Sequence, residues 1–419
     1  MSKRLIITLV TAIFLIFGVF VAIRFAKGYR LDLKKKKIAA TGLLVANSFP
    51  TGAQVFIDDK LTTATDDTLN LPPGEYKVKI VKDGSIPWEK LLTLKKEIVT
   101  QTNATLFPAV PDLKALTFTG ALNAIPSPDG QKIAFAVASP SSELKNGLWV
   151  LDLNSKPLGF SRDSRQIARN ITQIDYAKAQ FVWSPDSKQI IASYDKNNVL
   201  LEAEKFNDPA SLRYVTARLS LILDEWKKEI QLKETKKIEK LPLEMQKIAT
   251  LSAQLLFWSP DEEKLMYTAT ASATIPSQLI PSLPGSNTQP ETRDIKAGNI
   301  YVYDLKEDKN FFIIEKIEEE KQQTEENYQI NNFYQSIPFY KPTSNQHIQW
   351  FPDSYHLVLQ EQNKLTILEY DGTNKDVVYA GPFEERFVYP WPDSSKLLIL
   401  TSFNRETPYP PNLYAIVLK

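Results

Sequence analysis

A proline–aspartate turn that recurs five times constrains this 419-residue chain more than any other feature of its sequence. Each copy is followed by a short apolar run and then by a second one. Proline presets the backbone angle φ of a turn, and the aspartate side chain accepts hydrogen bonds from the backbone N–H groups just after it. Short apolar runs separated by turns are typical of β-hairpins. The five turns are Pro128-Asp129, Pro185-Asp186, Pro260-Asp261, Pro352-Asp353 and Pro392-Asp393.

One small sheet built from such a unit cannot bury both of its faces. Repetition around a ring solves this problem and leaves only short sheet edges. The last two prolines, Pro352 and Pro392, are 40 residues apart, which is the period of a propeller blade. The longer intervals between the earlier copies predict insertions. The sequence therefore predicts an all-β fold with a β-propeller that has five clear blades and could have six or seven.

Two copies carry a longer pattern, Trp183-Ser184-Pro185-Asp186 and Trp258-Ser259-Pro260-Asp261, and the strand Ile300–Leu305 reads I-Y-V-Y-D-L. These segments resemble the WD-like repeat of TolB-type β-propellers, and the resemblance spans residues 113–419. The fourth and fifth copies lack the serine, and the glycine of the pattern survives only at Gly130. We expect the segment from Leu113 to Phe118 to supply the strand that closes the ring.

An uncharged stretch, residues 5–23, lies near the N-terminus. At about 1.5 Å per residue it just crosses a hydrocarbon core of about 30 Å. Seven Lys or Arg residues follow it within residues 24–37, and it has no clear small-x-small cleavage site. We expect a membrane anchor that contacts the lipid bilayer through residues 5–23. A cleavable signal peptide and a buried helix are the rival interpretations.

Residues 38–108 predict a small β domain. Tyr76, Val78 and Ile80 alternate with lysines, as in a strand with one buried face. Residues 48–58 and 69–78 closely resemble the PEGA domain, a compact β-sandwich of surface and envelope proteins. Asp59 stands where that family usually has a glycine, so we expect a different turn in the first hairpin. The domain order is then an anchor with its basic flank (1–37), a PEGA-like domain (38–108) and a propeller (109–419).

Three insertions are expected in the propeller, at about 205–250, 272–296 and 306–345. The first contains apolar residues at helical spacing, from Leu212 to Ile230 and again from Leu243 to Leu251. It predicts a helical hairpin that packs on the propeller rim, or alternatively an element that docks a partner. The second holds four prolines and predicts an exposed, mobile loop. The third includes the glutamate-rich stretch 315–329, a solvated face rather than a metal site.

Composition excludes several kinds of chemistry. The chain has no cysteine, which excludes disulfides, thiol catalysis, cysteine zinc sites and a lipoprotein anchor. His347 and His356 are too few for a typical histidine metal site. His356 falls within an expected blade strand and is expected to be a packed or rim residue rather than a base or ligand. No G-x-S-x-G elbow and no phosphate-binding loop occurs. We therefore expect no cofactor, no metal and no enzymatic activity.

The repeated residues themselves have a structural and a functional interpretation. The five turn aspartates are expected to be structural rather than calcium ligands, because calcium needs several oxygens converging at one turn. Three tryptophans could stack on sugars, but their fixed place before the turn favours packing between blades. They are Trp183, Trp258 and Trp350.

Charge gives conflicting indications about location. Residues 1–37 hold nine Lys or Arg and one Asp, which leaves 41 basic and 48 acidic residues in the rest of the chain. The acidic balance of the rest argues against a nucleic-acid-binding surface. The basic flank after the anchor favours a cytoplasmic location of the bulk of the chain. The resemblance to envelope modules favours export, and we expect a single-pass membrane protein whose bulk is extracytoplasmic.

The expected function is a membrane-anchored envelope protein whose propeller is a non-catalytic binding platform for a protein or glycan partner. One alternative is a propeller-type enzyme acting on cell-wall polysaccharide. The other is a purely structural surface protein. A propeller fold by itself does not decide between them.

Overall fold

The computed structural model describes residues 3–26, 29–32, 37–139, 142–153, 164–315, 333, 347–384, 387–403 and 410–419. The chain forms two compact units. The first unit is Met1–Ala109 together with Ser282–Pro290, and the second is Val110–Pro281 together with Glu291–Lys419.

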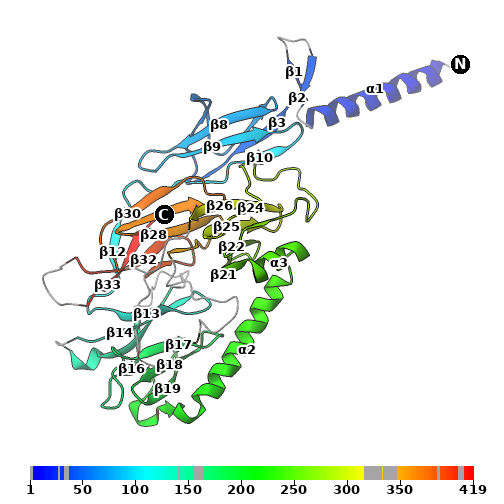
Figure 1. Ribbon diagram of the computed structural model, residues 1–419. Helices are drawn as coiled ribbons and strands as arrows, with labels where there is room; N and C mark the ends of the chain where they lie inside the picture. Colours follow the sequence, from blue (N-terminus) through cyan, green and yellow to red (C-terminus); the bar gives the residue numbers. More distant parts are fainter. Residues whose placement is uncertain are drawn as a thin grey trace. The chain divides into compact units, whose positions relative to one another are not determined.

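The chain begins with α1 (Lys3–Ala26), which Figure 1 shows as a single uninterrupted helix. Its Ile7–Arg24 stretch is long and apolar enough to cross a membrane, and none of it is buried. A hairpin of β1 (Tyr29–Asp32) and β2 (Lys37–Ala40) follows. Because its apolar side chains have no protein neighbours to bury them, the helix fits a lipid environment by composition and length.

The PEGA-like domain is built from three small sheets. Their strand orders are β6-β5-β8-β9, β10-β3-β7 and β11-β4. One core joins alternate residues of these strands, including Leu44, Val55, Ile80 and Trp88. The strands are β3 (Gly42–Ala46), β4 (Ser48–Phe49), β5 (Gln54–Ile57), β6 (Lys60–Ala64), β7 (Asp67–Leu71), β8 (Gly74–Val81), β9 (Trp88–Leu94), β10 (Val99–Gln101) and β11 (Ala104–Thr105).

The first hairpin of this domain keeps a tight turn without glycine. Asp58 and Asp59 lie between β5 and β6 with φ angles of 48° and 62°. Two consecutive residues with positive φ are the signature of the two-residue type I′ turn that suits hairpins. Aspartate tolerates this region better than most residues, so the turn forms without a glycine.

Among the described residues, the second unit contains five four-stranded antiparallel sheets, one for each proline–aspartate turn. We call them blades one to five in chain order. The prediction of an all-β propeller with five clear blades is confirmed. Blades one to three are β13 (Leu122–Pro126), β14 (Lys132–Val137), β15 (Gly147–Asp152) and β16 (Arg165–Arg169); β17 (Gln180–Trp183), β18 (Gln189–Tyr194), β19 (Asn197–Glu202) and β20 (Arg213–Tyr214); and β21 (Ala253–Trp258), β22 (Lys264–Ala269), β25 (Asn299–Asp304) and β26 (Lys309–Glu315).

Blades four and five complete the ring. They are β27 (Ile348–Trp350), β28 (His356–Glu361), β29 (Lys364–Glu369) and β30 (Asp376–Ala380); and β31 (Val388–Pro390), β32 (Lys396–Thr401), β33 (Asn412–Val417) and β12 (Leu113–Ala115). The strand β12 pairs with β33, with Leu113 opposite Ile416. The first propeller strand therefore closes the last blade, as the sequence predicted, and this pairing fastens the two ends of the second unit together.

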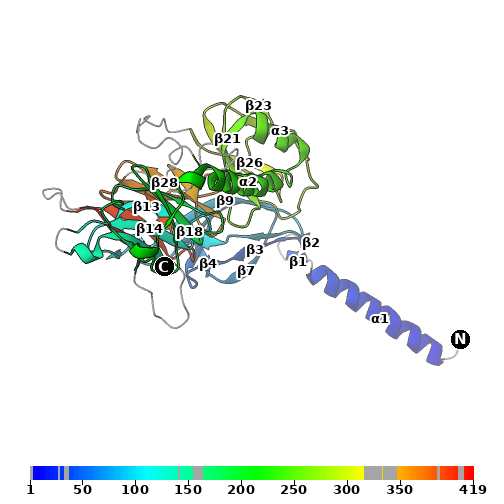
Figure 2. The ribbon, with the colours of Figure 1, turned by 90° about the horizontal axis from the view of Figure 1, so that it is seen from below.

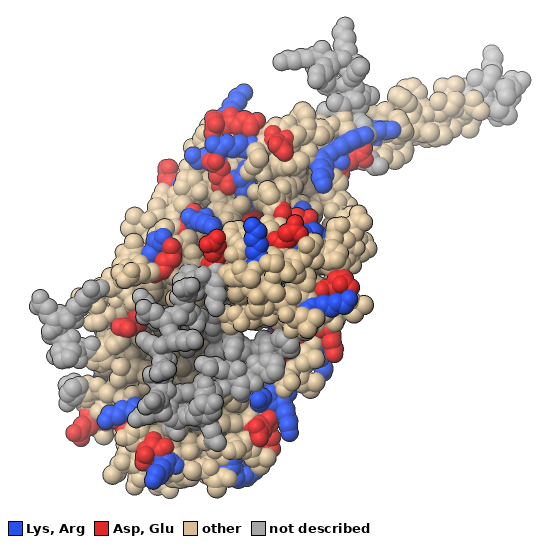
Figure 3. Space-filling view, viewed as in Figure 1, with Lys and Arg blue, Asp and Glu red and all other residues tan. Residues whose placement is uncertain are grey.

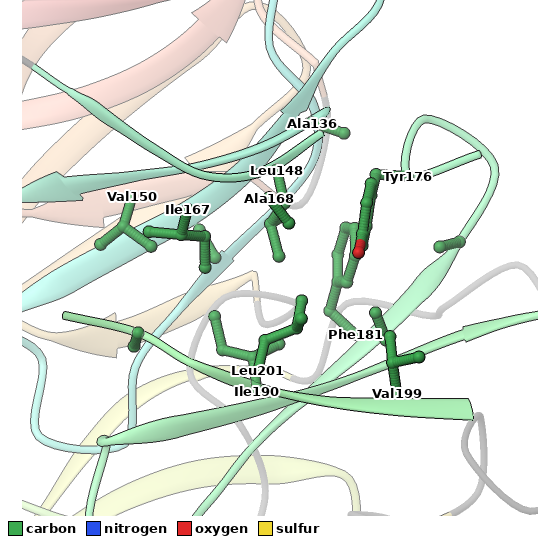
Figure 4. Packing of buried hydrophobic residues seen from close by; sticks show 14 of the residues in the cluster. Ala136, Leu148, Val150, Ile167, Ala168, Tyr176, Phe181, Ile190, Val199 and Leu201 are labelled. Carbon is green, nitrogen blue, oxygen red and sulfur yellow. The ribbon is translucent and has the colours of Figure 1, made fainter. Parts of the chain in front are cut away.

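The blades bury both faces, because alternate residues of each strand enter different clusters. In blade two, Phe181 and Trp183 pack toward blade one, whereas Val182 packs in the opposite direction. Figure 4 shows the cluster between blades one and two, with Leu148 and Ile167 on one side and Ile190 and Leu201 on the other. This two-sided burial explains why the strands are apolar runs rather than strict alternations.

Two helices form a layer between blades two and three. They are α2 (Leu219–Ile238) and α3 (Leu243–Leu251), and α2 is the long green helix of Figures 1 and 2. The buried face of α2 joins the outer face of blade two, and α3 with the end of α2 joins a face of blade three. The helices thus lie against sheet faces where a neighbouring blade would otherwise pack, rather than on the rim.

The helical pattern starts later than the sequence suggested. Leu212 and Val215 precede α2, and the stretch between them contains β20, the last strand of blade two. Asp208 and Pro209 begin a short 3-10 turn there, and the Asp208 side chain accepts a hydrogen bond from the Ala210 N–H. Strand pairing with β19 overrides the apparent helical spacing, so the insertion is shorter than predicted.

The other two insertions also differ from the prediction. Residues 309–315 form β26 of blade three, and the rest of the glutamate-rich stretch lies outside the described residues. The proline-rich insertion contains a short antiparallel strand pair, β23 (Ala273–Thr274) with β24 (Asp294–Ile295). Its tip, Ser282–Pro290, belongs to the first unit, and residues 286–289 are half-buried rather than fully exposed.

Candidate binding surface

The five proline–aspartate turns share one local geometry. In the first three copies the aspartate Oδ1 accepts a hydrogen bond from the serine hydroxyl two residues earlier, at 2.5–2.7 Å. The same oxygen accepts the backbone N–H two residues later in all five copies. The aspartates are therefore engaged within their own turns, at the starts of strands. They are Asp129, Asp186, Asp261, Asp353 and Asp393.

These contacts stabilise the charged form of the carboxylates. Burial alone would raise the pKa of Asp186 and of Asp261. The hydroxyls of Ser184 and Ser259 and the backbone donors outweigh this effect and hold each pKa below its usual range. A group held so firmly as an anion acts poorly as a proton donor near neutral pH, which agrees with a structural role.

The residue after the aspartate has a left-handed backbone in all five turns. Its φ lies between 57° and 72°, although only Gly130 is a glycine. The other four are Ser187, Glu262, Ser354 and Ser394. At Gly130 a Cβ atom would stand 2.7 Å from the Tyr389 hydroxyl of blade five, so a side chain here would require the tyrosine to shift. At Ser187, Glu262 and Ser354 the side chain reaches the neighbouring element.

The fourth turn uses a histidine where the first three use serine. Phe351 replaces the serine, and the buried His356 places its Nδ1 2.7 Å from Asp353 Oδ2. Burial would raise the pKa of Asp353, but the hydrogen bond with His356 and the backbone N–H groups hold that pKa below its usual range. His356 is thus a packed residue that stabilises a turn, in line with its expected role.

Two tryptophans join neighbouring blades in the same register. The indole N–H of Trp183 in blade two donates to the Ile125 carbonyl of blade one at 3.4 Å. The indole N–H of Trp350 in blade four donates to the Phe257 carbonyl of blade three at 2.8 Å. The sequence favoured packing over sugar stacking, and both tryptophans are buried between blades.

A serine hydroxyl adds a second bond at the same two junctions. The Asp129 N–H of blade one donates to Ser187 Oγ of blade two at 3.0 Å. The Asp261 N–H of blade three donates to Ser354 Oγ of blade four, also at 3.0 Å. Sequence reasoning missed this role, because a glycine is expected at this position and serine looked like a mere loss of the pattern.

A buried lysine reinforces the junction between blades three and four. Lys264 is 5% exposed, and its Nζ lies 5.1 and 4.9 Å from the ring centres of Tyr355 and Tyr370. Asp261 and Asp304 stand 3.8 and 4.0 Å from the same ammonium group. Two aromatic faces and two carboxylates compensate a buried cation. A polar residue begins the second strand of every blade, which is the sequence signal for this position.

The junction between blades two and three is made by the helical layer. Glu262 takes the place of the bridging serine and pairs with Lys240 and with Lys237, the latter at 3.6 Å. The hydrogen bond from Lys240 is the main reason why the pKa of Glu262 is below its usual range. Trp258 packs against the cluster that contains Ile238 and Met245 instead of reaching another blade.

The outer side of this layer carries exposed leucines. In α3, Leu243 and Leu251 are 74% and 78% exposed, whereas the sequence pattern counted both among the apolar face. Met245 and Ala249 are buried in their place. In α2, Leu221 and Leu232 are more than half exposed. These four side chains, with the charged residues between them, form what we call the helical surface.

No other chemical site emerges from the described residues. Among them, no three His, Asp or Glu side chains gather in a way that could hold a metal ion. On the face shown in Figure 3, basic and acidic side chains are interspersed across the described residues, without an extended basic patch. The helical surface is therefore the region that most clearly departs from a regular propeller and is the candidate for binding.

Comparison with known proteins supports the modular description. The family model of the PEGA domain matches residues 41–109, which confirms the resemblance seen in the sequence. The chain is similar to the putative TolB from Agrobacterium tumefaciens, with 14% identity, a TM-score of 0.21, and 71% of this chain and 72% of that chain covered. No curated protein matches the sequence.

Two further solved structures are similar. TolB from Acinetobacter baumannii has 11% identity and a TM-score of 0.22, with 81% of this chain and 59% of that chain covered. An oligogalacturonate lyase from Vibrio parahaemolyticus has 10% identity and a TM-score of 0.25, with 82% of this chain and 86% of that chain covered. The chain thus spans little more than half of the Acinetobacter protein. The five four-stranded sheets among the described residues define the propeller of this chain.

Proposed function

We propose that this protein is a membrane-anchored envelope protein that binds another protein, without catalysis, through its helical surface. The observation that carries the proposal is the replacement of a blade-to-blade junction by α2 and α3, whose outer leucines are exposed. Apolar side chains on a rigid, well-supported helical layer are what a protein partner can bury with little loss of conformational entropy.

The anchor and the PEGA-like domain support the envelope location. α1 has the length and composition of a membrane span, and the PEGA family occurs on surface and envelope proteins. The basic flank after α1 points toward the cytoplasm instead. We propose export of the bulk of the chain. The PEGA-like domain points to the envelope more strongly than the basic flank points to the cytoplasm. No specific observation in the described residues favours a polysaccharide-cleaving or a purely structural role.

The location can be tested with one introduced thiol, since the chain has no cysteine. Ala297 is a suitable position, because it is exposed in the turn between β24 and β25. We expect Ala297→Cys to react with a membrane-impermeant maleimide in intact cells. Labelling that occurs only after lysis would contradict export and would direct the search to cytoplasmic partners.

Binding can be tested by placing a photo-crosslinking amino acid at Leu243 or Leu251 of the full chain in its native membrane. We expect a discrete adduct that protease digestion shows to be a protein. The matched control is Lys196, an exposed residue in the turn between β18 and β19, which should give no adduct. In the Leu243 crosslinker chain, Leu251→Glu should weaken the adduct. Equal yields at all three positions, or an adduct that only glycosidases remove, would overturn the proposal.

A further inference from the structure

The two edges of the largest PEGA-like sheet differ in how well they are protected. The sheet order is β6-β5-β8-β9, so β6 and β9 are its edge strands. β6 has five residues and a register shift opposite Val55 and Phe56. β9 has seven residues and pairs with β8 over the whole stretch from Leu94 to Trp88 without any shift. A long, regular edge is the kind that adds a strand from another chain.

The tip of the proline-rich insertion covers part of this regular edge. The Thr93 N–H of β9 donates to Thr288 Oγ at 3.3 Å, and Gln289 Nε2 donates to the Leu91 carbonyl at 2.8 Å. Residues two apart in a strand direct their backbone groups to the same side. The N–H and C=O that the tip engages therefore belong to one side of β9, and β8 pairs with the other.

A turn within the tip of the insertion lets the tip lie close to β9 and β10. The Gln289 N–H donates to Asn287 Oδ1 at 2.9 Å, which makes a turn that presents the side chains of residues 288 and 289. A Cβ atom on Gly285 would stand 3.2 Å from the Val99 carbonyl, so the tip also lies tightly against the start of β10. These contacts are all internal to the first unit.

The base of the insertion is held firmly within the second unit. Asp308 is buried and accepts hydrogen bonds from the Leu279 N–H and the Tyr303 hydroxyl, at 2.8 and 2.9 Å. Arg293 pairs with the same carboxylate and donates to the Pro276 carbonyl at 2.6 Å. These contacts order the base of the insertion within its own unit.

We propose that Ser282–Pro290 is an edge cap, which prevents β9 from pairing with β9 of a second copy of this chain. The cap bonds to the strand through side chains, not through a backbone ladder, so it blocks the edge without extending the sheet. An added strand would itself become a new exposed edge of the sheet, whereas the cap does not. Leu91, which is 55% exposed on β9, would otherwise support antiparallel pairing with its counterpart.

The contact is tested with Thr93→Cys combined with Thr288→Cys in the full chain in native membranes. The Thr93 N–H lies 3.3 Å from Thr288 Oγ1, so we expect thiols at the two positions to come close enough to react with each other. We expect an intramolecular crosslink, seen as a mobility shift on a non-reducing gel and absent from either single variant. Failure of the pair to crosslink under oxidising conditions would overturn the proposal.

The capping role is tested with the triple variant Gly285→Val, Thr288→Ala and Gln289→Ala, as the full chain in detergent. We expect faster hydrogen exchange in the peptide that spans β9, and a larger oligomer by light scattering. Adding Leu91→Lys should restore the original size. The matched control, Ser277→Ala with Gln278→Ala, changes exposed residues outside the tip and should behave like the unaltered chain. Unchanged exchange, or oligomers that Leu91→Lys does not dissociate, would overturn the proposal.

Discussion

Two blade junctions contain the same sequence, Trp-Ser-Pro-Asp, but form different contacts. One lies between blades one and two, and the other between blades two and three. At the first, Trp183 and Ser187 bond to the backbone of the preceding blade. At the second, Trp258 packs on helices, and Glu262 forms ion pairs with α2. The repeat therefore specifies the turn, whereas its neighbour decides what the tryptophan and the fourth turn residue do.

This difference shows that the propeller accommodates a layer of helices, α2 and α3, at the junction between blades two and three. The junction between blades three and four returns to the regular pattern, with Trp350 and Ser354 in the roles of Trp183 and Ser187. Apolar sheet faces can be buried by any complementary apolar surface, since the hydrophobic effect is not directional. Helices that present Leu223, Ile230 and Met245 satisfy this requirement as well as a blade does.

The largest expected effect on stability comes from replacing Trp183, and it should exceed the effect of replacing Trp258. We expect Trp183→Ala to lower the free energy of unfolding of the propeller by about 4 kcal/mol, because a fully buried indole leaves a cavity. Trp258→Ala should cost about 2 kcal/mol, since that side chain is only half-buried and the helices can adjust. Urea unfolding of the full chain in detergent, followed by circular dichroism, measures both. Equal losses would show that the helical junction is packed as rigidly as the regular one.

A smaller effect distinguishes the inside of the helical layer from its outer surface. Met245→Ala should cost about 3 kcal/mol, because the side chain is completely buried between α3 and blade three. Leu243→Ala, two residues earlier, should change the free energy by less than about 0.5 kcal/mol, because its side chain is exposed. The same unfolding experiment applies. A comparable loss for Leu243→Ala would mean that this leucine is covered within the chain and unavailable to a partner.

The smallest expected effect compares the residues after the aspartates. Ser187→Ala should cost about 1 kcal/mol, since it removes the hydroxyl that accepts the Asp129 N–H in a buried place. Glu262→Ala should cost at most about 0.5 kcal/mol, because its ion pairs are partly exposed. Salt provides the discriminating measurement: added NaCl should reduce the Glu262 effect and leave the Ser187 effect unchanged. If salt altered both alike, the assumed difference in chemistry would be wrong.

Sequence reasoning succeeded where a local pattern has one physical solution. The proline–aspartate turns, the uncharged N-terminal helix and the alternation in Tyr76 to Ile80 each follow from backbone preference or from one buried face. It failed where two patterns competed. Leu212 and Val215 fit helical spacing, yet the strand between them pairs with β19. Leu243 and Leu251 fit the same spacing, yet they are exposed because α3 turns Met245 inward.

The sequence by itself determined the order of modules, the five blades and the pairing of the first propeller strand with the last blade. The blades follow from a turn that recurs along the chain, the anchor from one uncharged stretch, and the small β domain from its resemblance to the PEGA family. None of these inferences needs knowledge of what packs against the segment. Only the tertiary structure decided that helices fill one junction, that His356 takes a serine's place at Asp353, and that residues 282–290 cover β9. The helical junction and the contacts of β9 join segments that are far apart in the sequence, and His356 reaches Asp353 only through the packing of its own turn. Such partners are set when the elements pack together.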